Sequence, residues 1–167
     1  MPKCVVVGVA SSVAVFKSVQ LVSDLVKKGF DVEVIMTRNA AAFITPLQFS
    51  SLTHHKTLVE TMEFSENYEI EHISIAKKAD VFILVPATAN VIAKVAHGIA
   101  DDMLTTTFLA ASCPKLIAPA MNTAMYLNPL TQSNLQRCAG HGMRIIEPDE
   151  GLLACGEYCI FLSLHKF

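Results

Sequence analysis

The chain has 167 residues, which is long enough for one domain with a substantial hydrophobic core. Charged residues make up only 17% of it, below the roughly 25% of typical soluble domains, which predicts apolar surface covered by subunits or a cofactor. The formal net charge of −2, without a basic run, argues against nucleic acid as a partner, and no apolar stretch reaches the roughly 20 residues of a membrane span.

The five cysteines are scattered and fit no zinc-binding spacing, so we predict no metal site. Reduced thiols of this kind are typical of a cytoplasmic protein. The chain enters a strand-like run within four residues of Met1, and we therefore expect no signal peptide.

Short β-branched runs alternate with segments of helical spacing along the chain. In chain order we predict strand 3–9, helix 12–28, strand 31–36, a loop with short helical pieces over 37–51, an unassigned stretch over 53–71, helix 72–79, strand 81–85, helices 91–96 and 103–111, strand 115–118, helix 130–139 and strand 144–147. This alternation predicts a single-domain α/β fold over residues 1–167, a Rossmann-like three-layer fold with a parallel sheet and helices on both faces.

The turns that follow the strands are the predicted binding region, because ligands in such folds lie beyond the carboxyl ends of the strands. The first turn, Gly8 to Ser12, offers backbone N–H groups and hydroxyls that suit a phosphate at a helix N-terminus, although it is equally consistent with a plain capped turn. It lacks the G-x-G-x-x-G pattern, and the second strand ends at Thr37 without an acidic residue for an adenosine ribose. Both absences favour a mononucleotide over a dinucleotide.

The third and fourth turns each begin with a proline, at Pro86 and Pro119, that we expect to end a strand. Thr88, Asn90 and Asn122 then provide hydrogen-bond donors and acceptors that match the pyrimidine edge of a flavin. Alternatively, the asparagines only cap helices. That reading suits Asn90 better than Asn122, which lies several residues before the next predicted helix.

At these residues the sequence resembles the homo-oligomeric flavin-containing cysteine decarboxylases. The matching segments follow one another in order over nearly the whole chain, at residues 8–17, 37–44, 72–80, 86–102, 119–125 and 151–156. The resemblance implies a Rossmann-like fold, bound FMN, a homotrimer or a dodecamer built from trimers, and oxidative decarboxylation of a small-molecule substrate that ends in a cysteine.

The resemblance also implies roles for individual residues. His72 is expected to be the active-site base, Asn122 to hold the substrate carboxylate, and Cys155 to donate the last proton from a flap near residues 148–160. We expect the cofactor to contact Gly8, Ser11, Ser12, Thr37, Phe43, Pro86, Thr88, Asn90, Asp101, Ala120 and Met121. The expected substrate contacts are Asn122, Met125 and Ala154.

Other polar and thiol side chains have structural interpretations. Asp101 and Asp102 precede a predicted helix and are expected to cap it, with a flavin contact from one of them. Lys94 is interpreted as structural or as close to a phosphate. The other cysteines are expected to be structural, among them Cys4 and Cys138.

The C-terminal segment departs from the family pattern, because residues 158–164 read Tyr-Cys-Ile-Phe-Leu-Ser-Leu where a glycine-rich turn is expected. This departure bears on closure of the flap. The family often carries a fused synthetase domain, and we expect a separate synthetase here. Three alternatives remain at this point: a lantibiotic-type peptidyl-cysteine decarboxylase, a flavin prenyltransferase, and a non-enzymatic flavoprotein that regulates a partner.

Overall fold

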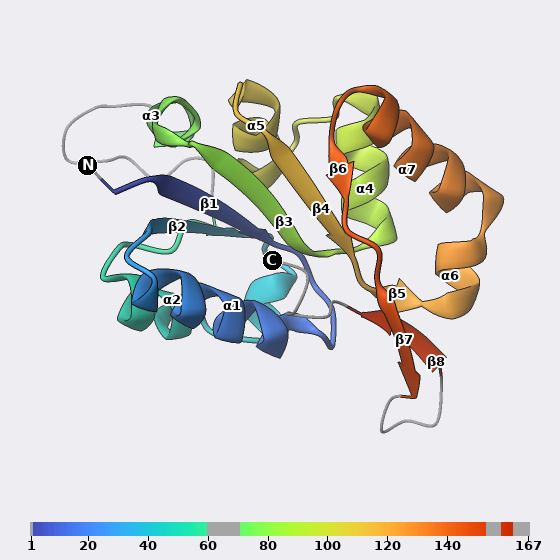
Figure 1. Ribbon diagram of the computed structural model, residues 1–167, viewed down its shortest axis with the longest axis horizontal. Coiled ribbons are helices and arrows are strands. Elements are labelled where there is room, and N and C mark those ends of the chain that lie inside the picture. The colour runs from blue at the N-terminus through green and yellow to red at the C-terminus, as the bar shows by residue number, and fades with distance from the viewer. Residues whose placement is uncertain (1, 60–70, 153–157, 162–167) are drawn as a thin grey trace.

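The computed structural model describes residues 2–59, 71–152 and 158–161. Its centre is a five-stranded parallel sheet in the order β2-β1-β3-β4-β6 (Figure 1). The strands are β1 Cys4–Val9, β2 Asp31–Met36, β3 Val81–Ala87, β4 Lys115–Pro119 and β6 Arg144–Ile145. The chain passes from β1 to β2 at one edge and returns to β3 on the other side of β1, so the topological switch point lies between β1 and β3.

Helices cover both faces of this sheet (Figure 1). One face carries α1 Val15–Lys27 and α2 Pro46–Thr53, joined to β2 through the 3-10 helix η1 Ala40–Ala42. The other face carries α3 Glu71–Lys78, α4 Ala89–His97, α5 Met103–Ala110 and α7 Pro129–Gly140. The predicted α/β fold with a parallel sheet and two helical layers is therefore confirmed.

Successive side chains of β1 point to opposite faces of the sheet and pack into two separate buried clusters. Val5, Val7 and Val9 pack toward α1, in one buried cluster with Leu21 and Val22. The intervening residues pack toward α4 and α5, in the second buried cluster. Because successive side chains of a strand point to opposite faces, a strand that is buried on both sides reads as an unbroken apolar run.

A smaller antiparallel sheet lies beyond the end of β4, in the order β5-β8-β7 (Figure 1). It consists of β5 Met121–Asn122, β7 Asp149–Leu152 and β8 Tyr158–Phe161, with β8 paired to both neighbours. The sequence did not predict this sheet. Its central strand, β8, comes from the segment that departs from the family pattern. By pairing with both neighbours, β8 connects β7 in the predicted flap region to β5, the strand that carries Asn122.

The proline that was expected to end the third strand lies inside it. β3 continues through Pro86 to Ala87, with a register shift in its pairing to β4 between Leu84 and Ala87. The irregularity allows a residue without an N–H to remain in the strand. The carbonyl of Pro86 also accepts a hydrogen bond from the N–H of Ala10, which ties the ends of β3 and β1 together.

The start of the first helix and the presence of one short helix differ from the prediction. The first helix begins at Val15 rather than Ser12, because the Ser12 hydroxyl accepts the N–H of Ala14 in a turn outside the helix. The short helix α6, Thr123–Leu127, was not predicted. Among the described residues, no helix combines the length and the apolar character needed to cross a bilayer.

Candidate functional site

A cavity of about 600 Å³ opens at the carboxyl ends of β1, β2 and β3. This volume lies within the range of about 300–1,000 Å³ that is usual for ligand pockets. Its lining residues come from the turns after these strands, the segment after α2, α4, the segment before α5, and α6: Ser11, Thr37, Arg38, Asn39, Val59, Thr88, Ala89, Asn90, Val91, Lys94, Asp101, Asp102 and Met125. The cavity therefore lies at the switch point, where a parallel α/β sheet binds its ligand.

Backbone hydrogen bonds hold the turns around the cavity in register. The N–H of Thr37 donates to the carbonyl of Val9 at 2.9 Å, which links the ends of β2 and β1. The N–H of Ala120 donates to the carbonyl of Ala87 at 3.0 Å, which links the ends of β4 and β3. The rim is thus an extension of the sheet rather than a set of independent loops.

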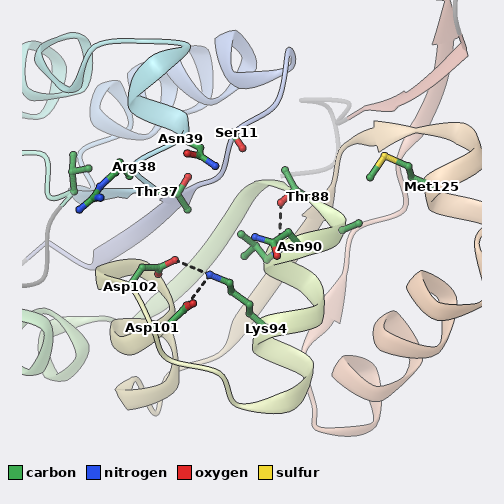
Figure 2. Close-up of a pocket in the computed structure, with 13 residues that line it drawn as sticks. Ser11, Thr37, Arg38, Asn39, Thr88, Asn90, Lys94, Asp101, Asp102 and Met125 are labelled. Carbon is green, nitrogen blue, oxygen red and sulfur yellow. Dashed lines mark hydrogen bonds and ion pairs between the residues drawn. The ribbon is translucent and has the colours of Figure 1, made fainter.

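Hydroxyl and amide groups line one part of the cavity (Figure 2). Ser11, Thr37 and Asn39 lie together on one side, while Thr88 and Asn90 project from the start of α4. The Thr88 hydroxyl oxygen accepts the N–H of Val91 at 3.3 Å and so caps α4. A hydroxyl that accepts in a cap still has a proton to donate.

Charged groups line another part of the cavity. The Lys94 ammonium donates to Asp101 Oδ1 at 2.7 Å and lies 3.5 Å from Asp102 Oδ2 (Figure 2). The hydrogen bond to Asp101 raises the pKa of Lys94, and the same bond lowers the pKa of Asp101. Asp102 also forms a capping box with Thr105 at the start of α5, so the expected helix cap is confirmed for Asp102.

Six of the predicted site residues line the cavity: Ser11, Thr37, Thr88, Asn90, Asp101 and Met125. Pro86, Ala120 and Met121 are buried near the ends of β3 and β4. Phe43 is exposed after η1 and is not among the lining residues, nor is Ser12. The cofactor and substrate contacts assigned to all of these residues remain predictions.

Gly8 lies inside β1, where a side chain would meet the core. A Cβ at this position would come within 3.0 Å of Phe82, 3.1 Å of Leu84 and 3.2 Å of Leu104. The glycine therefore has a packing reason to be there, whether or not its backbone also contacts a cofactor.

Asn122 caps α6 through its Oδ1, which accepts the N–H of Ala124 at 2.8 Å. Asn122 is therefore a helix cap, although capping looked less suited to it than to Asn90, and the residue that caps α4 is Thr88 rather than Asn90. The expected contact of Asn122 with the substrate carboxylate remains a prediction. Met125 follows Asn122 by three residues, so both lie on one side of the first turn of α6. Met125 lines the cavity, whereas Asn122 is not among the residues that line it.

Of the other two predicted catalytic residues, the structure describes one and not the other. His72 is half-buried in the first turn of α3 and is not among the residues that line the cavity. Cys155, together with the predicted substrate contact Ala154, lies outside the described residues.

Sequence reasoning named neither Arg38 nor Asn39 as a site residue, although both line the cavity and directly follow Thr37 at the end of β2. Asp102 also lines the cavity. It was expected to cap a helix, with a flavin contact from it or from Asp101, but its contact with Lys94 depends on how α4 packs against α5.

The described thiols are structural. Burial raises the pKa of Cys4 to about 12 and also raises the pKa values of Cys113 and Cys138. All three remain protonated near neutral pH and are free of disulfides. The structural interpretation of Cys4 and Cys138 is confirmed by their burial.

Comparison with known proteins shows the family to which the chain belongs. The model of the Flavoprotein family matches residues 1–161. A probable phosphopantothenoylcysteine decarboxylase of Streptococcus mutans is 42% identical over 159 residues, covering 94% of this chain and 89% of its own length. This chain belongs to the flavoprotein family, and its relatives in that family include phosphopantothenoylcysteine decarboxylases.

Longer relatives match as well. The coenzyme A biosynthesis bifunctional protein CoaBC of Bacillus subtilis is 48% identical over 152 residues, covering 91% of this chain but 37% of its own length. The chain thus spans about two fifths of the length of the bifunctional relatives it matches.

Two solved structures share the fold. The FMN-dependent cysteine decarboxylase SpaF superposes with a TM-score of 0.87 at 33% identity, covering 98% of this chain and 91% of its own. A PPC decarboxylase variant complexed with pantothenoylaminoethenethiol superposes with a TM-score of 0.83 at 27% identity, covering 96% and 90%.

Proposed function

We propose that this protein is an FMN-dependent phosphopantothenoylcysteine decarboxylase. It converts 4'-phospho-N-pantothenoylcysteine to 4'-phosphopantetheine in coenzyme A biosynthesis. The observation that carries the proposal is the cavity at the β1/β3 switch point, lined by hydroxyl and amide groups in a chain whose full-length relative at 42% identity is named for this activity.

The cavity residues fit FMN. Ser11, Thr37 and Asn39 provide neutral donors suited to a phosphate, and Arg38 adds a cation beside them. Thr88 and Asn90 offer both donors and acceptors to a pyrimidine edge. The end of β2 has no acidic residue to hold an adenosine ribose, which fits a mononucleotide.

When bound, FMN supplies a hydride acceptor for the carbon that carries the substrate sulfur, which is the electron sink that decarboxylation needs. His72 takes the thiol proton, since a ring nitrogen of the neutral imidazole can accept one. Asn122 donates hydrogen bonds to the carboxylate without adding a charge that would retain it. Cys155 donates the last proton, since an ordinary thiol is mostly protonated at pH 7.

The proposed assembly is a homotrimer, or a dodecamer built from trimers, with the cofactor near subunit contacts. Large apolar side chains are exposed over α1 and α2 and over α6 and α7: Val13, Phe16, Phe43, Leu47, Leu127 and Leu130. Contacts between subunits would cover such surface. His72, which does not line the cavity of its own chain, then reaches a site completed by a neighbouring subunit.

We propose a separate synthetase as the enzyme that supplies the substrate, and the cytoplasm as the location. The synthetase proposal is supported by the decarboxylase relative of S. mutans, of which this chain covers 89%. The location is supported by the free cysteines of the described residues, which suit a reducing compartment.

The test is incubation of the FMN-loaded protein with phosphopantothenoylcysteine and analysis of the products by mass spectrometry. We expect saturated phosphopantetheine and one equivalent of CO₂. A peptide that ends in cysteine, offered in parallel, should remain unchanged. Conversion of the peptide alone would assign the protein to the peptidyl-cysteine decarboxylases, and conversion of neither by a yellow protein would contradict the enzymatic assignment.

A further inference from the structure

The part of the cavity wall that comes from α4 and the segment before α5 carries more negative than positive charge, whereas the cation Arg38 lies apart from it, beside Thr37 at the end of β2 (Figure 2). Lys94 lies on α4, while Asp101 and Asp102 lie immediately before α5, and the ammonium is placed between the two carboxylates (Figure 2). We call these three residues the cavity cluster. Hydrogen bonding raises the pKa of Lys94 and lowers that of Asp101, so one positive and two negative charges leave the cluster with a net charge of −1 near neutral pH.

The three members of the cavity cluster have different structural duties. Asp102 Oδ1 accepts the Thr105 N–H at 2.7 Å and is needed for the start of α5. The Lys94 side chain is 20% exposed and that of Asp101 is 56% exposed. Asp101 caps no helix, and its carboxylate binds Lys94 from the solvent side of the wall. Its charge is therefore available for a role other than holding the fold.

The net negative charge has a consequence for a redox cofactor. The oxidised ring system of FMN is neutral and would gain one negative charge on accepting a hydride, and a negative wall would disfavour that charge. We propose that the cavity cluster lowers the reduction potential of bound FMN, with Asp101 as the residue that sets the sign. This inference rests on the proposed function, because it requires FMN in this cavity.

The proposed reaction gives such tuning a purpose. The substrate loses a thiol proton and a hydride to form a C=S group, and CO₂ then leaves to give an enethiolate. The enethiolate takes up two protons and the same hydride to become the saturated thiol. The hydride must therefore return, and a wall that destabilises the reduced cofactor favours the return.

The test is the midpoint potential of bound FMN at pH 7.5, measured by equilibration with a reference dye in three variants. Asp101→Asn makes the cluster neutral and should raise the potential. Lys94→Gln makes it −2 and should lower it. We expect each change to alter the ratio of the dissociation constants of oxidised and reduced FMN about tenfold, equal to about 30 mV for a two-electron couple.

The double variant, Lys94→Gln with Asp101→Asn, again has a net charge of −1 and should return to the wild-type potential within about twofold in that ratio. A merely structural role for the ion pair would not produce opposite shifts in the single variants or their cancellation in the double variant. Lys78→Gln is the matched control, since Lys78 also lies between two carboxylates but is not among the residues that line the cavity.

The outcomes separate this inference from the proposed function. Yellow wild-type protein with the same potential in all variants, or with shifts in one direction only, would overturn the inference alone. Wild-type protein that fails to bind FMN would overturn both.

Discussion

Lys94 and Lys78, both in the part of the chain that the structure describes, each lie between two carboxylates, at opposite ends of the sheet. Lys94 belongs to the cavity cluster at the carboxyl ends of the strands. Lys78, the last residue of α3, lies 2.9 Å from Asp31 Oδ2 and 2.6 Å from Glu33 Oε1 on the edge strand β2. His55 joins this second group through a contact of 2.9 Å to Glu33, and we call the four residues the edge cluster.

The chemistry of the two clusters is similar, but their surroundings differ. The cavity cluster faces a space of about 600 Å³ that is open to a ligand. In the edge cluster, Lys78 already supplies the cation for the carboxylates and ties α3 to β2. Both clusters contain a lysine between two carboxylates, so their different roles come from their positions in the fold. The cavity cluster lies at the carboxyl ends of the parallel strands, where ligands bind, and the edge cluster does not.

The largest difference in turnover is expected between two histidine variants, one at the predicted catalytic residue His72 and one in the edge cluster. We expect His72→Asn to lower turnover of phosphopantothenoylcysteine at least about 100-fold, because general acid-base groups contribute 10²–10⁴ to rates. His55→Asn, which removes the histidine of the edge cluster, should change turnover less than twofold. Steady-state assays of the two FMN-loaded variants check this, and equal losses would contradict the separation of the two ends.

Substitution of Gly8 tests whether this residue serves the packing of the core or the binding of the cofactor. Gly8→Ala should lower the free energy of unfolding by about 1–3 kcal/mol, because the added methyl group crowds three core side chains. Gly140→Ala is the control, since a Cβ there meets no atom within 4 Å. Urea unfolding of the apo proteins measures the difference. A stable Gly8→Ala protein that no longer binds FMN would instead assign Gly8 to the cofactor.

Of the two aspartates of the cavity cluster, we expect Asp102 to contribute to the stability of the fold and Asp101 to contribute little to it. Asp102→Ala should lower the free energy of unfolding by about 1 kcal/mol through loss of the cap on α5. Asp101→Asn should leave it nearly unchanged, since the exposed pair with Lys94 is screened by solvent. Thermal unfolding of both variants provides the check, and a larger loss for Asp101→Asn would make that pair structural.

The smallest effect is expected in the edge cluster. Lys78→Gln should lower the free energy of unfolding by less than about 1 kcal/mol, because its side chain is 42% exposed. Hydrogen bonds to Glu33 and Asp31 raise the pKa of Lys78 against the opposing effect of desolvation. The stabilisation should therefore be present at neutral pH and disappear only as the pH rises above about 10.4, the usual lysine pKa.

Thermal midpoints of wild type and Lys78→Gln, compared at pH 7.5 and at pH 11 or above, measure that loss. The affinity for FMN should be unchanged at pH 7.5. A weaker affinity would mean that the edge cluster also acts on the cavity, which would contradict the separate roles of the two clusters.

The five parallel strands and most helices were predictable because burial on both faces leaves unbroken apolar runs between segments of helical period. The turn residues Ser11, Thr37, Thr88 and Asn90 were predictable for a topological reason, since parallel strands bring their carboxyl ends to one edge. Thus the general position of the cavity followed from the order of the elements.

Other features depend on contacts that no local pattern contains. Helix α6 has five residues, too few for a period to be recognised, and β5 has two. The pairing of β5 with β8 joins Asn122 to Cys159, 37 positions further along the chain. The contact between Lys94 and Asp101 likewise requires the packed positions of α4 and the segment before α5, so its role in the wall was not readable from sequence.

The most direct test of the central claim is the absorbance of FMN-loaded protein after rapid mixing with phosphopantothenoylcysteine. We predict that the flavin band bleaches as the substrate gives up its hydride and then recovers as phosphopantetheine forms. A flavin band that stays unchanged while the substrate is also unchanged would contradict the assignment of this cavity to oxidative decarboxylation.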